Sequence, residues 1–289
     1  MKARPSPSSN RETALRVPGP PALPLAILAF GQQADRLSAF RWLASPVPVT
    51  WSLPQQIASS IGDRILADLA APGVWLREQD LADEFHVSRG PIRAAFQILQ
   101  AEGLVHVHAR RGAQVTQLTA VEVRDIFEIR ASLFQLVARL LATQRDPAYL
   151  AALEEAIRKL EELTGAAAKS DEYARTVFRL SLYSASACGN ERLRNILTAL
   201  SLQTFRYSRL GLTGAARRKR SLALWKATLA AVRAGDADRA EAVAAQRVSE
   251  NGAAAERKLM AAGASGASAA GAVSSATFAS SASLTGEIQ

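Results

Sequence analysis

Residues 76–103 constrain the fold most strongly, because their pattern predicts two short helices joined by a tight turn. Ser88 can cap the second helix, and Pro91 lies in its first turn, where a missing N–H costs little. Apolar residues then recur with the i, i+3, i+4, i+7 spacing of one buried helical face: Ile92, Ala95, Phe96 and Leu99. Together these features predict a helix-turn-helix.

The opposite face of this second helix carries Arg89 and Arg93, followed by Gln97 and Gln100. Long guanidinium and amide side chains can reach guanine or adenine edges, or phosphate oxygens, in a DNA major groove. The alternative is that the two arginines only form a solvated charged face, which is the commoner role of helical arginines. Because they project from a helix that follows a tight turn, we favour DNA binding.

The segments on either side complete a small domain. Ser52 and Gln55 form a possible capping box for a preceding helix. After the helix-turn-helix, residues 105–108 and 114–116 are predicted to be two strands around the turn Arg110-Arg111-Gly112. Residues 51–118 are therefore expected to form a winged helix-turn-helix, with three helices and a two-stranded basic wing.

Composition is consistent with two globular domains but gives little support for nucleic-acid binding. The chain has 289 residues, 48% hydrophobic and 21% charged, with a net charge of +9. Residues 51–118 nevertheless carry six basic and seven acidic side chains, so DNA affinity must come from the placement of a few arginines. The single Cys188 excludes an internal disulfide or a CxxC site and fits a reducing, cytoplasmic environment.

Both ends of the chain lack a helical or strand period. Residues 1–50 are rich in Pro, Ser and Ala, and we expect a disordered leader. Residues 21–31 imitate a secretory signal but contain two prolines and no clear cleavage site; an upstream start codon is the other explanation. Residues 261–289 are almost entirely Ala, Ser and Gly and are expected to be a disordered tail. No apolar run is long enough for a membrane span.

Between these parts, residues 119–260 carry only helical signals. Thr119 and Glu122 make a second capping box, and Asp146-Pro147 begins another helix. The absence of alternating apolar patterns predicts an all-α bundle. The basic run 217–220 is expected to be an exposed loop, with a contact to the DNA backbone as the alternative.

The first domain resembles the winged helix-turn-helix of GntR-family bacterial transcription regulators. The similarity lies in LxExxLAxxxxVSRxPxRxA from Leu76, AEGLV from Ala101 and RRGxxV from Arg110. The resemblance implies that operator DNA is contacted by the SRxPxR segment and the wing. The expected DNA-binding residues are Gln79, Ser88, Arg89, Gly90, Arg93, Arg110, Arg111 and Gly112. Gln79 departs from the family, which often has arginine there, so one cationic contact is expected to be missing.

The second domain resembles the FCD effector domain of the FadR-type subfamily, through VRDIFEIRASL from Val123, ACGN from Ala187 and AVRAGDADRAE from Ala231. Many FCD domains hold a divalent metal with one Asp and three His. The matching positions here are Arg175, Arg179, Trp225 and Arg247, and all three histidines of the chain lie in the first domain. We therefore expect no metal and no cofactor.

Those substitutions keep the region cationic, so the resemblance implies that it could bind an anionic effector directly. Independently of the family, Arg130 interrupts an apolar helical face and needs either an internal carboxylate or a ligand anion. For Arg175 and Arg179 the alternatives are a solvated face or ion pairs with acidic neighbours. Trp225 forms either a pocket wall or ordinary core. The expected effector-binding residues are Arg130, Arg175, Arg179, Trp225 and Arg247.

The sequence thus predicts a mainly α-helical, dimeric transcription repressor that binds palindromic double-stranded operator DNA and a small organic-acid effector. The alternative is a DNA-binding protein whose helical domain only dimerises. We do not expect an enzyme, because residues 119–289 contain no histidine, no activated nucleophile and no glycine-rich phosphate loop.

Overall fold

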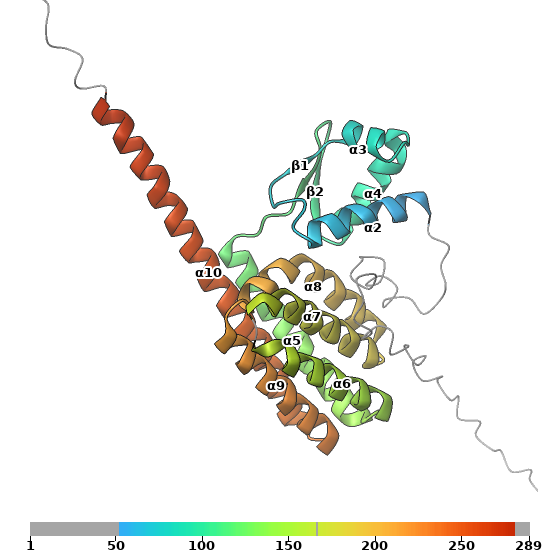
Figure 1. Ribbon diagram of the computed structural model, residues 1–289. Helices are drawn as coiled ribbons and strands as arrows, with labels where there is room; N and C mark the ends of the chain where they lie inside the picture. Colours follow the sequence, from blue (N-terminus) through green and yellow to red (C-terminus); the bar gives the residue numbers. More distant parts are fainter. Residues whose placement is uncertain (1–51, 166, 281–289) are drawn as a thin grey trace, which may run out of the picture.

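The computed structural model describes residues 52–165 and 167–280, which form two domains (Figure 1). The predicted leader over residues 1–50 lies outside the described residues. We call residues 52–118 the winged domain. Its elements in chain order are α2 (Leu53–Leu66), β1 (Trp75–Leu76), α3 (Glu78–Glu84), α4 (Arg89–Ala101), β2 (Val105–His108) and β3 (Gly112–Val115).

The local signals of the winged domain lie where the sequence predicts them, although the Ser88 hydroxyl makes no capping hydrogen bond. The Ser52 and Gln55 side chains make the capping box at the start of α2, and Ser88 is the N-cap residue of α4. One face of α4 forms the centre of the core, and its four side chains have no exposed surface: Ile92, Ala95, Phe96 and Leu99. The exposed face of α4 is consequently fixed in direction.

The wing has three strands, not the two expected. The order in the sheet is β1-β3-β2, all antiparallel, with Leu76 and Val107 both opposite Ala113. The strand expected over residues 114–116 is β3, which spans Gly112–Val115. Gly112 has φ +96°, and a Cβ there would lie 2.3 Å from the carbonyl oxygen of Leu76. Glycine is thus required for the added strand to approach the wing.

The helical domain, residues 119–280, contains only helices in its described part. They are α5 (Ala120–Gln144), α6 (Pro147–Thr164), a 3₁₀ turn η3 (Ala167–Lys169), α7 (Ser170–Ala187), α8 (Glu191–Gly211), α9 (Ala215–Ala234) and α10 (Ala237–Ser280). The Thr119/Glu122 capping box and the Asp146 N-cap are both formed. Figure 1 shows α5 and α10 packed among the other helices, with the end of α10 projecting away from them.

Two expectations for this domain are wrong. The tail predicted to be disordered from residue 261 continues as helix to Ser280, in keeping with the high helix propensity of alanine. The basic run 217–220 lies in α9 instead of an exposed loop. Arg218 is fully buried and donates to the carbonyl oxygens of Thr164 at 3.2 Å and Thr213 at 2.7 Å. Thr164 is the last residue of α6, and Thr213 lies two residues after the end of α8. The charge of Arg218 therefore stabilises two helix C-termini.

The two domains share an apolar interface. Four side chains of α7 and α8 pack into the core of the winged domain: Phe178, Leu182, Leu202 and Phe205. Beside them, Arg209 of α8 contacts Asp68 of the winged domain at 2.6 Å and Asp171 of α7 at 2.5 Å. Because α7 and α8 contribute to both cores, a change in the helical domain can be transmitted to the winged domain.

Among the described residues, none of the helices combines the length and the apolar character required to span a bilayer.

Candidate nucleic-acid interface and ligand cavity

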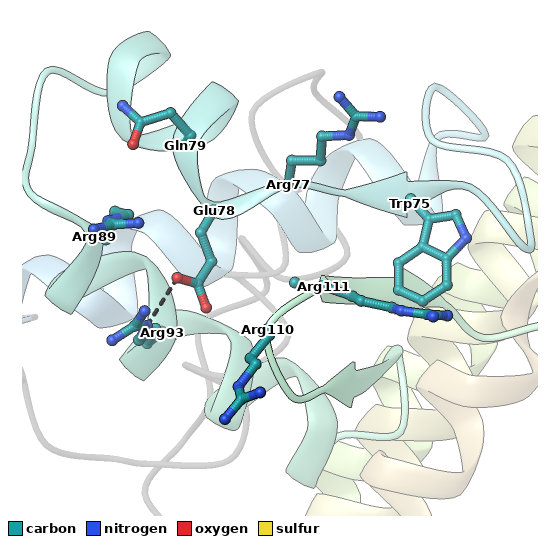
Figure 2. A pocket seen from close by; sticks show the side chains of 9 residues that line it. Trp75, Arg77, Glu78, Gln79, Arg89, Arg93, Arg110 and Arg111 are labelled. Carbon is teal, nitrogen blue, oxygen red and sulfur yellow. Dashed lines mark hydrogen bonds and ion pairs between the residues drawn. The ribbon is translucent and has the colours of Figure 1, made fainter.

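A concave surface of about 730 Å³ lies between α3, the start of α4 and the wing, and we call it the recognition cleft (Figure 2). Its lining contains five arginines and one carboxylate. The lining residues are Trp75, Arg77, Glu78, Gln79, Arg89, Arg93, Arg110, Arg111 and Gly112. A cleft with this excess of guanidinium groups attracts a polyanion such as DNA.

Arg89 and Arg93 project from the exposed face of α4 into this cleft (Figure 2). The Arg93 side chain is 63% exposed and its Nε donates to Oε2 of Glu78 at 2.8 Å. Neither arginine is turned into the core or covered by the helical domain. The sequence prediction that both point to solvent is therefore confirmed.

The other predicted residues of the helix-turn-helix differ in what they offer to a ligand. Gln79 lines the cleft, but its Nε2 donates to Asp83 Oδ1 at 2.8 Å, along α3. Ser88 is exposed and makes no side-chain cap hydrogen bond, which leaves its hydroxyl available for a phosphate. Gly90 is exposed, and a Cβ there would meet only Ser88 Oγ at 3.9 Å. Thus Gly90 is not required by packing within this chain.

Three residues of the cleft were not predicted from the sequence, Trp75, Arg77 and Glu78, and Arg77 is the cation among them. It is the N-cap residue of α3, is exposed, and lies two positions before Gln79. The sequence did contain a signal for it, because Arg77 is a basic residue two positions before the one where the family often has arginine. Arg77 therefore brings a cation into the cleft, although Gln79 supplies none.

The wing contributes its turn as expected. Arg110 adopts the left-handed region with φ +64°, and Arg111 follows it before Gly112. At the base of the wing, the Trp75 ring lies 4.9 Å from the His108 ring between centroids. The turn thus adds two guanidinium groups to the lining of the cleft, and in Figure 2 they point in different directions, that of Arg111 toward Trp75.

A second hollow of about 30 Å³ lies inside the helical domain, and we call it the arginine cavity. It is enclosed by five helices and its charged side chains are both arginines. The lining residues are Phe127, Arg130, Ala174, Val177, Phe178, Ser181, Ser208, Leu212, Ser221, Arg247, Val248 and Asn251. Its volume is enough for about one or two water molecules, so a larger ligand requires the helices to separate.

Arg130 is 5% exposed and has no carboxylate partner among the described residues. Its NH1 donates to Thr204 Oγ1 at 2.8 Å, and its guanidinium lies 4.8 Å from the Phe127 ring centroid, while Nε is buried without a hydrogen bond. Burial, with the nearby charge of Arg247, lowers the pKa of Arg130 to about 9. The group remains a cation at neutral pH with an unused donor.

Arg247 is the second charge of the cavity and is 6% exposed. Its guanidinium lies 3.6 Å from the Trp225 ring centroid, and NH1 has a long 3.5 Å contact to Ser181 Oγ. Burial lowers the pKa of Arg247 to about 10. Trp225 has no exposed surface, and its ring packs against the Arg247 guanidinium. It therefore belongs to the core and does not line the cavity.

The remaining two predicted effector residues do not line the cavity. Arg175 donates through Nε to Asp171 Oδ2 at 2.7 Å and lies over the Phe205 ring near the domain interface. Arg179 is 5% exposed in α7, where burial lowers its pKa. For Arg175 the structure therefore shows the ion pair with an acidic neighbour that was expected as an alternative. Of the five predicted effector residues, only Arg130 and Arg247 line the arginine cavity.

The four positions that match the family's metal ligands carry three guanidinium groups and one indole, and none of these coordinates a divalent cation. The residues present therefore do not fit a metal. The described part of the chain contains no group of three or more His, Cys, Asp or Glu side chains that could hold a metal ion.

Comparison with known proteins gives two domain matches. Residues 53–115 match the gntR family of bacterial regulatory proteins, and residues 125–250 match the FCD domain. The HTH-type transcriptional regulator YdhC of Bacillus subtilis is 32% identical over 126 residues, which cover 44% of this chain and 56% of that protein. The gluconate operon transcriptional repressor of Bacillus licheniformis is 40% identical over 99 residues, covering 34% and 38%.

The chain thus spans about half the length of these curated relatives. The solved structure of McbR/YncC from E. coli superimposes with a TM-score of 0.60 at 21% identity, covering 72% of this chain and 99% of that one. The matched proteins are transcriptional regulators, not enzymes. With both domain types present in this order, the chain belongs to the GntR family of bacterial regulatory proteins and carries an FCD domain.

Proposed function

We propose that this protein is a sequence-specific DNA-binding transcription repressor that acts as a homodimer in the cytoplasm. The observation that carries the proposal is the recognition cleft, where Arg89 and Arg93 project from a rigid helix beside the basic wing. In such a cleft α4 enters the major groove, Arg89 and Arg93 contact base edges, and Arg110 and Arg111 contact phosphates.

The test is a fluorescence-anisotropy titration with the intergenic DNA beside the gene. Arg89→Ala and Arg93→Ala should each weaken specific binding by about 1 to 3 kcal/mol, because each removes a bidentate contact to a base. Arg110→Ala should weaken binding to all sequences alike and reduce its salt dependence, because it removes a phosphate contact. Unchanged binding by Arg89→Ala would contradict this assignment.

A stripe on α5 supports the homodimer. Along α5, apolar side chains that are half-buried or exposed repeat with alternating spacings of three and four: Ile126, Ile129, Leu133, Leu136 and Leu140. Ile129 is 51% exposed and Leu136 is 42% exposed. This heptad spacing forms a seam that pairs with another helix, and a two-fold dimer would bring the same seam from each copy together. Ile129→Asp should then convert dimer to monomer in analytical ultracentrifugation.

We further propose that a small organic anion binds in the arginine cavity and controls DNA binding. Arg130 and Arg247 supply two buried cations without a carboxylate partner in the described chain, and both have a buried Nε without a hydrogen bond. A carboxylate or phosphate would accept from these donors bidentately, without an intervening metal.

The neighbours of the cavity provide a route to the winged domain. Thr204, the partner of Arg130, precedes Phe205, which packs in the winged-domain core. Phe178 both lines the cavity and packs in that core. An anion that drew Arg130 away from Thr204 would change how α7 and α8 support the winged domain. Such an effector regulates only if it binds the DNA-competent and DNA-incompetent arrangements with different affinity.

The small size of the cavity supports the second candidate, a helical domain that only dimerises. A thermal-shift screen with organic acids separates the two. Effector binding gives a ligand-dependent rise in melting temperature that Arg130→Met abolishes, while Arg124→Met, an exposed control on the same helix, retains it. A domain that only dimerises responds to none of the acids.

A further inference from the structure

The recognition cleft contains one carboxylate among its five arginines, Glu78. A carboxylate that faces DNA phosphates opposes binding, so a surface selected only for affinity would exclude it. Glu78 is nevertheless the first residue of α3 and its side chain is only 20% exposed, held against the start of α4. Its position calls for a role other than affinity.

The contact between Glu78 and Arg93 has a specific geometry. Oε2 of Glu78 accepts from Nε of Arg93 at 2.8 Å, as the dashed line in Figure 2 marks. The terminal NH1 and NH2 groups of Arg93 make no hydrogen bond within the described residues. These two groups form the fork that donates to O6 and N7 of guanine. Glu78 therefore holds the side of the guanidinium and leaves its end available.

Arg89 lies one helical turn earlier and makes no such ion pair with the described residues. A free arginine must lose its side-chain entropy when it meets a base, and it can also turn to a phosphate instead. A guanidinium fixed at Nε has already lost much of that freedom. The cleft thus contains Arg89, whose side chain can change orientation, and Arg93, whose orientation is fixed by Glu78 before DNA binds.

We propose that Glu78 is a positioning residue for base recognition: it aims Arg93 at a guanine in each half-site and, through its charge, weakens binding to other DNA. The inference rests on the proposed DNA-binding function. Glu78 touches no base itself, so it acts through Arg93. It raises the ratio of specific to non-specific binding and lowers total affinity, which is specificity gained partly through repulsion.

The test uses two duplexes: one selected by the wild-type protein from a randomised library, and a scrambled duplex of the same composition. Glu78→Ala should tighten binding to the scrambled duplex severalfold, because a negative charge leaves the cleft. It should also reduce discrimination at the one base pair that Arg93→Ala relaxes, by about fivefold or more. Discrimination at the base pair that depends on Arg89 should not change.

Two further variants separate positioning from charge. Glu78→Gln keeps an oxygen that can accept from Arg93 Nε, so it should tighten scrambled DNA but retain discrimination. Asp80→Asn removes an exposed charge of α3 outside the cleft lining and should change both duplexes by the same small factor. In an Arg93→Ala background, Glu78→Ala should no longer alter discrimination.

Each result decides a different claim. If Glu78→Ala changes selected and scrambled duplexes equally, or alters discrimination without Arg93, the positioning role is overturned while the DNA-binding function stands. If the wild-type protein selects no sequence from the library, the DNA-binding function itself fails. Circular dichroism melting of each variant checks that the fold is intact, because a partly exposed ion pair of this kind contributes only about 0 to 1 kcal/mol to stability.

Discussion

Replacing Arg130 by methionine should stabilise the protein, although it removes a buried side chain that makes a hydrogen bond. Burial lowers the pKa of Arg130 from its ordinary, much higher range to about 9, which corresponds to about 5 kcal/mol of unfavourable interaction with the charged form. The hydrogen bond to Thr204 and the ring of Phe127 offset part of this, each by about 1 to 2 kcal/mol. A residual cost remains in the folded state.

Methionine fills a similar volume without a charge, and Thr204 keeps its own hydrogen bond to the Leu200 carbonyl oxygen at 2.7 Å. Arg130→Met should therefore raise the free energy of unfolding by about 1 to 3 kcal/mol, as replacement of buried charges by apolar residues often does. The melting temperature should rise by about 2 to 4 °C per kcal/mol. Urea unfolding followed by circular dichroism measures the change.

Arg218→Met is the matched control. Arg218 is buried as deeply, but its guanidinium donates to the carbonyl oxygens of Thr164, Leu212 and Thr213. Its removal leaves those acceptors unpaired, so this variant should lose about 3 to 5 kcal/mol. If Arg130→Met is destabilised to the same extent, the argument that Arg130 lacks a sufficient internal partner is refuted.

Three other perturbations test different parts of the molecule. Stabilisation by a bound anion should fall as pH rises through about 9, where Arg130 loses its proton. Without anion, stability should rise as pH increases above about 9, because the folded-state pKa lies below the unfolded one. In thermal-shift titrations, Arg130→Met should abolish the stabilisation by the anion and weaken the rise in stability with pH, to which Arg247, with its pKa lowered by burial to about 10, still contributes. Gly112→Ala should cost about 1 to 3 kcal/mol and weaken DNA binding, since it strains φ and displaces Leu76. Arg209→Ala should speed proteolysis of residues 116–119 by loosening the contact with Asp68, and unchanged cleavage would argue against a role in docking.

The sequence predicts the parts of this fold that depend on local periodicity. The buried face of α4 and the capping boxes at Ser52 and Thr119 are recognisable because their residues lie within one or two helical turns. β1 has two residues, too few to display an alternating pattern, and is held by a partner far along the chain. The formation of β1 therefore depends on its tertiary pairing with β3, which no local sequence pattern predicts.

The site residues show the same division. The exposure of Arg89 and Arg93 follows from helical spacing, whereas the Glu78–Arg93 pair joins residues from separate helices and is invisible to a one-helix pattern. Arg175 is different, because Asp171 lies four residues earlier and indicates the ion pair that the sequence analysis kept as an alternative to effector binding. Arg218 shows that a basic run can contain a structural cation.

The proposed control of DNA binding by the helical domain depends on α8 facing two environments at once. Thr204 and Ser208 face Arg130 and the cavity, while Leu202 and Phe205 pack in the winged-domain core. A rotation of α8 that frees Arg130 for an anion must also move Phe205 against the winged domain. Because packed cores accommodate such shifts in discrete steps, the domain contact would change between alternative arrangements instead of relaxing gradually. An effector in the arginine cavity therefore needs no contact with DNA or with α4 to alter the separation of two recognition helices.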